Sequence, residues 1–328
     1  MKRIAILVPQ GAAALGCIEG AYKLFTKTND FLLAMDKRPL FSVHLVGLTL
    51  TPQEYDGLFT VAPDLSVNDH LQMDLVIIPA VNGEMNTVID VNRGFFAWMV
   101  QQHAGGAEVA SLCVGTFLLA ATGLLEGKKC ATHWVAADTF RQMFPGIQLV
   151  SEKIITDEEG IYSSGGANSF WNLLIYLVEK YTDREMAILC SKYFEIEMGR
   201  YSQSPFIMFT GQRGHQDESV KLAQDFIEQN FQEKFTIDQL AVMFAVGKRS
   251  LERRFKKATG NTVSEYIQRV KMEAAKKGME TSRKNISEIM YEVGYSDTKS
   301  FRTIFKRTTG LSPVAYRNRY NKPPAFYL

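Results

Sequence analysis

The chain has 328 residues, 46% of them hydrophobic, so it is long enough for two domains with a buried core in each. No run of 18 apolar residues occurs and the N-terminus shows no convincing signal-peptide cleavage site, so we expect a cytoplasmic protein without a membrane partner. The four cysteines lack metal-ligand spacing; we expect lone thiols, no metal and no cofactor.

The first 200 residues alternate short apolar runs with segments of helical periodicity. Buried strands are predicted at residues 3–8, 41–48, 74–79 and 108–112. Helices are predicted near residues 16–35, 91–103, 114–121 and 167–181, with a hairpin-like stretch at 129–134. Strands that alternate with helices favour a parallel sheet covered by helices on both faces, which is a three-layer α/β sandwich.

Cys113 lies between the fourth predicted strand and a helix that closes at Gly123. A nucleophile at such a strand-to-helix turn is exposed at the carboxyl end of the sheet, where amides and the helix dipole can lower its pKa. A lone cysteine is more often a small buried hydrophobic side chain. From position alone, both interpretations of Cys113 stay open.

The run LCVGTFLLAATGLLEGKKCATHW, from Leu112 to Trp134, resembles the PfpI-like branch of the class I glutamine amidotransferase-like superfamily. The resemblance extends weakly over about residues 4–193 and implies a flavodoxin-like fold. It also implies a partner for Cys113 in His133, 20 residues further on.

Two supports of catalysis in that branch are missing or displaced. The usual acidic position falls on Gly16, with Glu19 one helical turn away, and a glycine pair near the oxyanion hole is replaced by the run from Pro79 to Gly83. We therefore expect no catalytic residues, but a ligand-binding or vestigial nucleophile site. Its members are Cys113, His133, Glu19, Val114 and Ala80.

Two alternatives remain for this cleft. The first is a working cysteine hydrolase or aldehyde-processing lyase joined to a DNA-binding domain. The second is a redox sensor, which ranks lower because Cys113 has no evident resolving cysteine in the sequence.

Charge divides the chain into two parts. Residues 218–322 hold 21 lysines and arginines against 12 aspartates and glutamates, a net charge of +9. The remainder holds 16 against 23, a net charge of −7. A basic C-terminal part indicates binding to a polyanion, and the Gly-, Ser- and Gln-rich residues 203–217 are predicted to be a linker.

The basic part contains an internal repeat. SLERRFKKATGNTVSEY begins at Ser250 and SFRTIFKRTTGLSPVAY begins at Ser300, 50 residues later. Short amphipathic segments, TIDQLAVMFAVG from Thr236 and NISEIMYEVG from Asn285, precede the copies and start with N-cap residues. A short helix, a turn and a second helix predict two helix-turn-helix units.

This region resembles the DNA-binding domain of AraC-type transcription regulators, above all in VGYSDTKSFRTIFKRTTGLSPVAYR from Val293. The resemblance implies seven helices, a linking helix at residues 263–279 opened by Thr262, and two helices that face successive major grooves. Gly247 stands where the family has a serine. The helix faces and the resemblance together give the expected DNA-contacting residues: Arg249, Ser250, Glu252, Arg253, Lys256, Thr298, Lys299, Arg302, Thr303 and Lys306.

The combined pattern predicts an α/β sandwich at residues 1–202, a linker at 203–217 and an all-α double helix-turn-helix domain at 218–322. We expect a bacterial, sequence-specific transcription regulator, in particular an activator, controlled by a small metabolite in the degenerate cleft. Its expected partners are double-stranded DNA, the metabolite, RNA polymerase by family resemblance, and a second copy in a homodimer.

Overall fold

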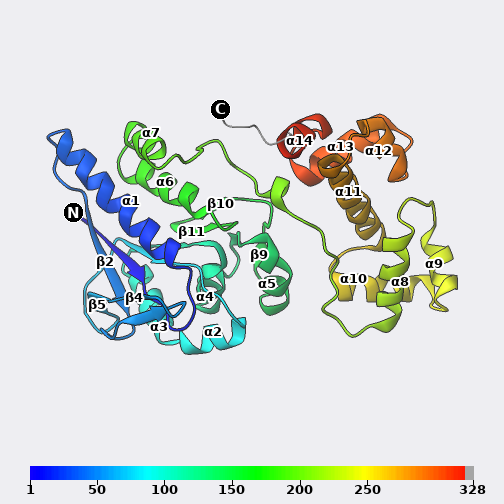
Figure 1. Cartoon of the computed structure of the whole chain (residues 1–328). Coiled ribbons are helices and arrows are strands. Elements are labelled where there is room, and N and C mark those ends of the chain that lie inside the picture. The colour runs from blue at the N-terminus through cyan, green and yellow to red at the C-terminus, as the bar shows by residue number, and fades with distance from the viewer. Residues whose placement is uncertain (322–328) are drawn as a thin grey trace. The chain divides into compact units, whose positions relative to one another are not determined.

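The computed structural model describes residues 1–321 and divides into two compact units, Met1–Gln203 and the part that begins at Ser204 (Figure 1). None of the helices among the described residues is long and apolar enough to cross a membrane. Each unit has its own hydrophobic cores.

A seven-stranded sheet in the order β10-β11-β7-β6-β1-β2-β5 forms the first unit. All neighbouring strands pair in parallel except β10 and β11 at one edge. The strands are β1 Lys2–Leu7, β2 Phe41–Gly47, β5 Leu65–Ser66, β6 Leu75–Ile78, β7 Glu108–Ser111, β10 Ile155–Glu158 and β11 Ile161–Ser164. The four strands predicted from apolar runs are the central ones, because a parallel sheet covered on both faces needs continuous apolar strands.

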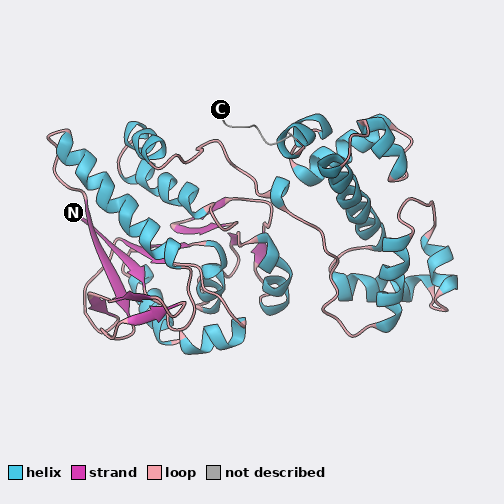
Figure 2. Cartoon of the chain, viewed as in Figure 1, coloured by secondary structure: helices cyan, strands magenta, loops and turns pink. Residues whose placement is uncertain are grey.

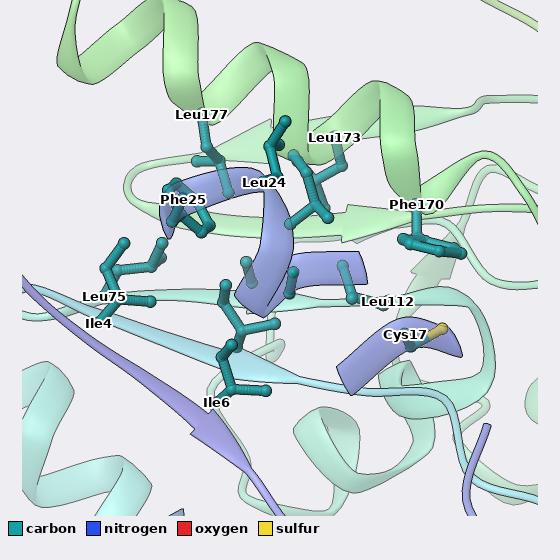
Figure 3. Close-up of a cluster of buried hydrophobic side chains, with 14 of the residues drawn as sticks. Ile4, Ile6, Cys17, Leu24, Phe25, Leu75, Leu112, Phe170, Leu173 and Leu177 are labelled. Atoms are coloured by element: carbon teal, nitrogen blue, oxygen red, sulfur yellow. The ribbon is translucent and has the colours of Figure 1, made fainter. Parts of the chain in front are cut away.

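Helices cover both faces of this sheet (Figure 1). The helices α1 Leu15–Ala34, α6 Phe170–Tyr181 and α7 Arg184–Tyr193 lie on one face. The other face carries α2 Met85–Val91, α3 Gly94–Ala104 and α4 Thr116–Ala121. Residues of β1 alternate between the two cores, and Figure 3 shows Ile4 and Ile6 directed toward Leu24, Phe25 and Leu173. The predicted three-layer sandwich is confirmed.

One local prediction in this unit is wrong. Residues 129–134 do not form a hairpin: β8 Lys129–Cys130 pairs in parallel with β9 Gln148–Leu149, across the 3-10 turn η2 Trp134–Ala136 and helix α5 Ala137–Met143. The helix predicted near 91–103 is α3, and α2 before it was not predicted. Between the two helices, the buried Asn92 side chain bonds Val88 O and the backbone of Gln10. The antiparallel pair β3 Gln53–Tyr55 and β4 Phe59–Val61 lies outside the predicted strands.

The described part of the second unit contains seven α-helices (Figure 2). They are α8 Glu218–Gln229, α9 Ile237–Met243, α10 Lys248–Thr259, α11 Val263–Thr281, α12 Ile286–Glu292, α13 Thr298–Thr309 and α14 Pro313–Tyr320. Thr236, Thr262 and Asn285 are N-caps with complete capping boxes, as their side chains accept from the N3 amide. One core surrounds α8 to α10 with the first half of α11, and a second surrounds α12 to α14 with its second half.

The residues shared by the two repeat copies hold equivalent positions in these cores. Phe255 and Phe305 are fully buried and meet Tyr266 and Tyr316 edge to face, with ring centroids 5.2 and 5.4 Å apart. The glycines after α10 and α13, the second helix of each helix-turn-helix unit, have positive φ, 69° at Gly260 and 73° at Gly310, which closes each helix at little conformational cost. The repeated residues of the sequence therefore build the same core contacts in both helix-turn-helix units.

Candidate nucleic-acid interface and ligand cleft

Helix α10 presents one basic face to solvent. Gly247 is its N-cap and has no side chain to accept an amide hydrogen bond. Leu251 and Phe255 anchor the opposite face in the core. Arg249, Glu252, Arg253 and Lys256 are exposed, and Ser250 is half-buried. In the described part of the chain only Lys256 among these has an ion pair, at 3.5 Å from Glu265, so the two arginines can reach an external acceptor.

Helix α13 repeats this design with different side chains. Its N-cap Asp297 accepts from Ser300 N at 2.5 Å, and Phe301 and Phe305 bury the inner face. The exposed outer face carries Thr298, Lys299, Arg302, Thr303 and Lys306. The Thr303 hydroxyl donates to Lys299 O at 2.8 Å.

The two outer faces have the chemistry of base-edge and phosphate recognition. Exposed guanidinium groups can donate two hydrogen bonds to guanine, and ammonium groups contact phosphates. Not every arginine of α10 is free for this: Arg254 binds both carboxylate oxygens of Asp217, at 2.7 and 2.5 Å. Arg254 is half-buried and has a structural role, whereas Arg249 and Arg253 are exposed.

Cys113 occupies a strained turn between β7 and α4. Its φ is +54°, which L residues rarely adopt, and its side chain is only 5% exposed. Hydroxyl groups hold the turn: Cys113 N donates to Ser164 Oγ at 3.2 Å, and Cys113 O accepts from Thr116 and Thr132, both at 3.0 Å. Three hydrogen bonds thus hold the backbone of Cys113 in its strained conformation.

The structure brings Cys113, Val114 and Ala80 together with a second thiol, Cys17. Burial, together with the nearby Cys17, raises the pKa of Cys113 to about 12, although the Val114 amide lowers it. Burial also raises the pKa of Cys17 to about 11, against the lowering effect of the Ala80 amide. The sequence interpretation missed Cys17, although its place next to Gly16, the expected acid position, was a signal.

The structure does not bring His133 and Glu19 into this group. His133 Nδ1 accepts from Val135 N at 3.1 Å, and among the described residues no hydrogen bond joins it to Cys113. Burial lowers the pKa of His133. Glu19 is exposed and pairs with Lys23 one turn along α1. Residues 1–321 contain no group of three or more potential metal ligands.

Comparison with known proteins agrees with this geometry. The profile of the DJ-1/PfpI family matches residues 2–180, which is more than half of the chain. The chain belongs to the DJ-1/PfpI family. A helix-turn-helix domain profile matches residues 240–319, so this DJ-1/PfpI member is also an AraC-family transcriptional regulator and a DNA-binding protein.

Two relatives align over more residues than either unit contains. The transcriptional regulator GbdR of Pseudomonas aeruginosa is 24% identical over 259 residues, which cover 79% of this chain and 69% of GbdR. The regulator ArgR of the same organism is 27% identical and covers 67% of each chain. A THiJ/PfpI family structure from Pseudomonas syringae shares the fold, with a TM-score of 0.50 at 15% identity over 81% of this chain and 90% of its own.

Proposed function

We propose that the protein is a ligand-responsive, sequence-specific activator of transcription that works in the cytoplasm as a homodimer and recruits RNA polymerase. The observation that carries this proposal is the pair of recognition helices with unlike exposed faces. Arg253 in α10 and Arg302 in α13 are both exposed and without ion pairs in the described part of the chain. Unlike faces support the reading of a defined, asymmetric sequence.

The test is binding to DNA selected from a random pool. Arg253→Ala and Arg302→Ala should each weaken binding to the selected sequence by about 1 to 3 kcal/mol, or about 5- to 150-fold, because each removes a base contact. Arg184→Ala, an exposed arginine on α7 of the first unit, is the matched charge control and should leave affinity unchanged. Equal affinity of all three variants contradicts the assignment.

The cleft around Cys113 is proposed to bind a small metabolite without transforming it. Support comes from the raised pKa of the buried thiol and from His133, whose Nδ1 is bonded to a backbone amide. A thermal-shift screen of metabolites on the full chain tests the idea, since a ligand at 100 times its Kd stabilises the folded state by about 2.7 kcal/mol. A metabolite that stabilises the protein in this screen should also change the affinity of the protein for the selected DNA.

The positive φ of Cys113 favours a second candidate, a working cysteine enzyme, because strain of this kind gathers at catalytic turns. Cys113→Ala separates the two. A variant that keeps its ligand-dependent DNA binding removes nucleophilic chemistry from regulation. Turnover of a small amide or aldehyde by the parent protein, lost in the variant, would establish the enzyme.

A further inference from the structure

The first unit ends at Gln203, a buried glutamine that is tied down at every polar atom of its side chain. It is 1% exposed. Its Oε1 accepts from Trp134 N at 3.2 Å, and its Nε2 donates to Thr132 O at 2.9 Å and Lys153 O at 3.2 Å. The backbone amide of Gln203 also donates to Glu152 O at 2.9 Å. Gln203 is therefore a fixed part of the first unit.

One partner of Gln203 is joined directly to the Cys113 turn, around which the candidate ligand cleft is proposed. The Thr132 hydroxyl donates to Cys113 O at 3.0 Å, and the Thr132 carbonyl accepts from Gln203 Nε2. Space around the glutamine is tight: a Cβ at Gly165 would lie 2.2 Å from Gln203 Nε2. A ligand that moves the loop at residues 132–134 must therefore carry Gln203 with it or break its hydrogen bonds.

The next residues are fixed in the second unit, beside the second recognition helix. The 3-10 turn η3 Ser204–Phe206 packs against α13, with Pro205 Cδ 3.9 Å from the Cβ position of Gly310 at the end of that helix. Pro205 O accepts from the Tyr320 hydroxyl at 3.0 Å. The Arg319 guanidinium lies 4.8 Å from the centre of the Phe206 ring. Ser204, the first residue of this turn, follows Gln203 directly in the chain.

A buried lysine fixes the following residues to α11. Lys276 is 3% exposed, and its Nζ donates to Ile207 O and to Glu273, both at 2.6 Å. Glu273 accepts from Phe209 N at 3.0 Å, and the Phe209 ring meets Tyr266 edge to face at 5.1 Å. Breaking a buried charge pair of this kind is costly, so residues 204–209 form a firm strap rather than a free spacer.

We propose that Gln203 and the strap at residues 204–209 couple the candidate cleft to the second recognition helix. Gln203 is the positioning residue. It would pass a displacement of the loop at 132–134 to the contacts at the C-terminal end of α13, because Gln203, anchored in the first unit, is followed directly by the turn η3, which packs in the second. This inference rests on the proposed function, control of DNA binding by a ligand, and it gives that control a physical route.

Hydrogen exchange of the full chain tests the coupling without a ligand or an operator. Lys276→Met removes the anchor in the second unit and should speed amide exchange at residues 204–209 by about tenfold or more. Coupling predicts faster exchange also at 131–135, in the first unit. Four residues, Gly-Ser-Gly-Ser, inserted after Gln203 should confine the change to the second unit. The same four residues inserted between Asp56 and Gly57, in the exposed β3–β4 turn, are the matched control. This insertion should leave the faster exchange at 131–135 in place.

A second variant covers the case in which Lys276→Met fails to fold. Thr132→Val removes the hydroxyl bonded to Cys113 O and should speed exchange at residues 204–209 from the opposite end. Exchange that changes only within the substituted unit, in a chain without the insertion, overturns the coupling.

The outcomes for the coupling and for the proposed function can be told apart. Coupled exchange in a protein that selects no DNA sequence leaves the coupling standing and refutes the proposed function. Once a ligand is known, a response of DNA binding that survives the insertion after Gln203 overturns the coupling and leaves the proposed function intact.

Discussion

Phe255 and Phe305 anchor the two recognition helices in their cores. Both rings are fully buried, and both pack edge to face on a tyrosine whose hydroxyl bonds a glutamate, Glu228 for Tyr266 and Glu280 for Tyr316. The buried Thr259 and Thr309, four residues later, bond the carbonyl oxygens of these phenylalanines at 2.8 and 2.9 Å. One ring thus positions a helix, its C-terminal end and the following tyrosine.

Phe305→Ala should lower the free energy of unfolding by about 3 to 5 kcal/mol, because it opens a cavity in a closed core. Urea unfolding of the full chain measures the change. Lys306→Ala, the next residue and an exposed one, is the control and should change stability by no more than about 0.5 kcal/mol. Equal effects of the two substitutions would show that the ring is not buried.

Cys113 should react slowly with iodoacetamide in the folded protein. Burial and the Cys17 thiol raise its pKa to about 12, so the group stays protonated from about pH 6 to 9, and only the thiolate reacts. Mass spectrometry of the labelled peptide, with the urea-unfolded chain as control, measures the rate. Fast labelling of the folded protein near pH 6 would indicate a lowered pKa and return the enzyme to consideration.

At the scale of elements, an ion pair joins helix α10 to the N-cap of α8, the helix that precedes the first helix-turn-helix unit. Asp217 caps α8 by accepting from Val220 N at 3.1 Å, and it also accepts two hydrogen bonds from Arg254 of α10. Arg254 holds the pKa of Asp217 below its usual value. The recognition helix α10 is therefore oriented partly by a carboxylate outside it.

Asp217→Asn should make the stability of the folded state depend less steeply on pH in the acid range. A carboxyl group with a depressed pKa in the folded state stabilises it above the unfolded value of about 3.9, and this contribution is lost as pH falls through the folded pKa. Thermal melts between about pH 2 and 6 should fall more steeply in the parent than in the variant, since asparagine keeps the cap but not the charge. In an Arg254→Met background the difference between aspartate and asparagine should shrink.

Elements with local signals were predictable from the sequence. Three helix starts, at Thr236, Thr262 and Asn285, were predictable because a polar N-cap residue is followed three residues later by a glutamine or glutamate at N3. The parallel pairing of Lys129–Cys130 with Gln148–Leu149 carries no such signal, since two-residue strands are defined by a partner far along the chain. The same holds for Cys17 beside Cys113 and for the hydrogen bonds of Gln203, which depend on tertiary contacts.

At the scale of the whole molecule, α11 joins the two helix-turn-helix units within the second unit of the chain. Its first half packs in one core and its second half in the other, and Phe231 packs against both. The helix has 19 residues, so at about 1.5 Å per residue it spans about 28 Å. That length suits two helices placed about one turn of DNA apart, roughly 34 Å.

The selected DNA should therefore contain two unlike elements about one helical turn, or 10 base pairs, apart. Five base pairs inserted between them should reduce affinity to that of a single element, because α11 cannot follow the rotation of the second groove. Fluorescence anisotropy on the spaced duplexes measures this, with five base pairs added outside the elements as control. Affinity that does not depend on the spacing would mean that only one unit reads bases.

The unlike faces of α10 and α13 also give the bound protein a direction. Under the proposed function, Arg249 and Arg253 on one helix and Lys299 and Arg302 on the other would contact different bases, so the two ends of the site would differ. Inverting the site would turn the DNA-binding unit end for end on the duplex. The orientation of a site relative to the start of transcription thus becomes information that a single chain can read.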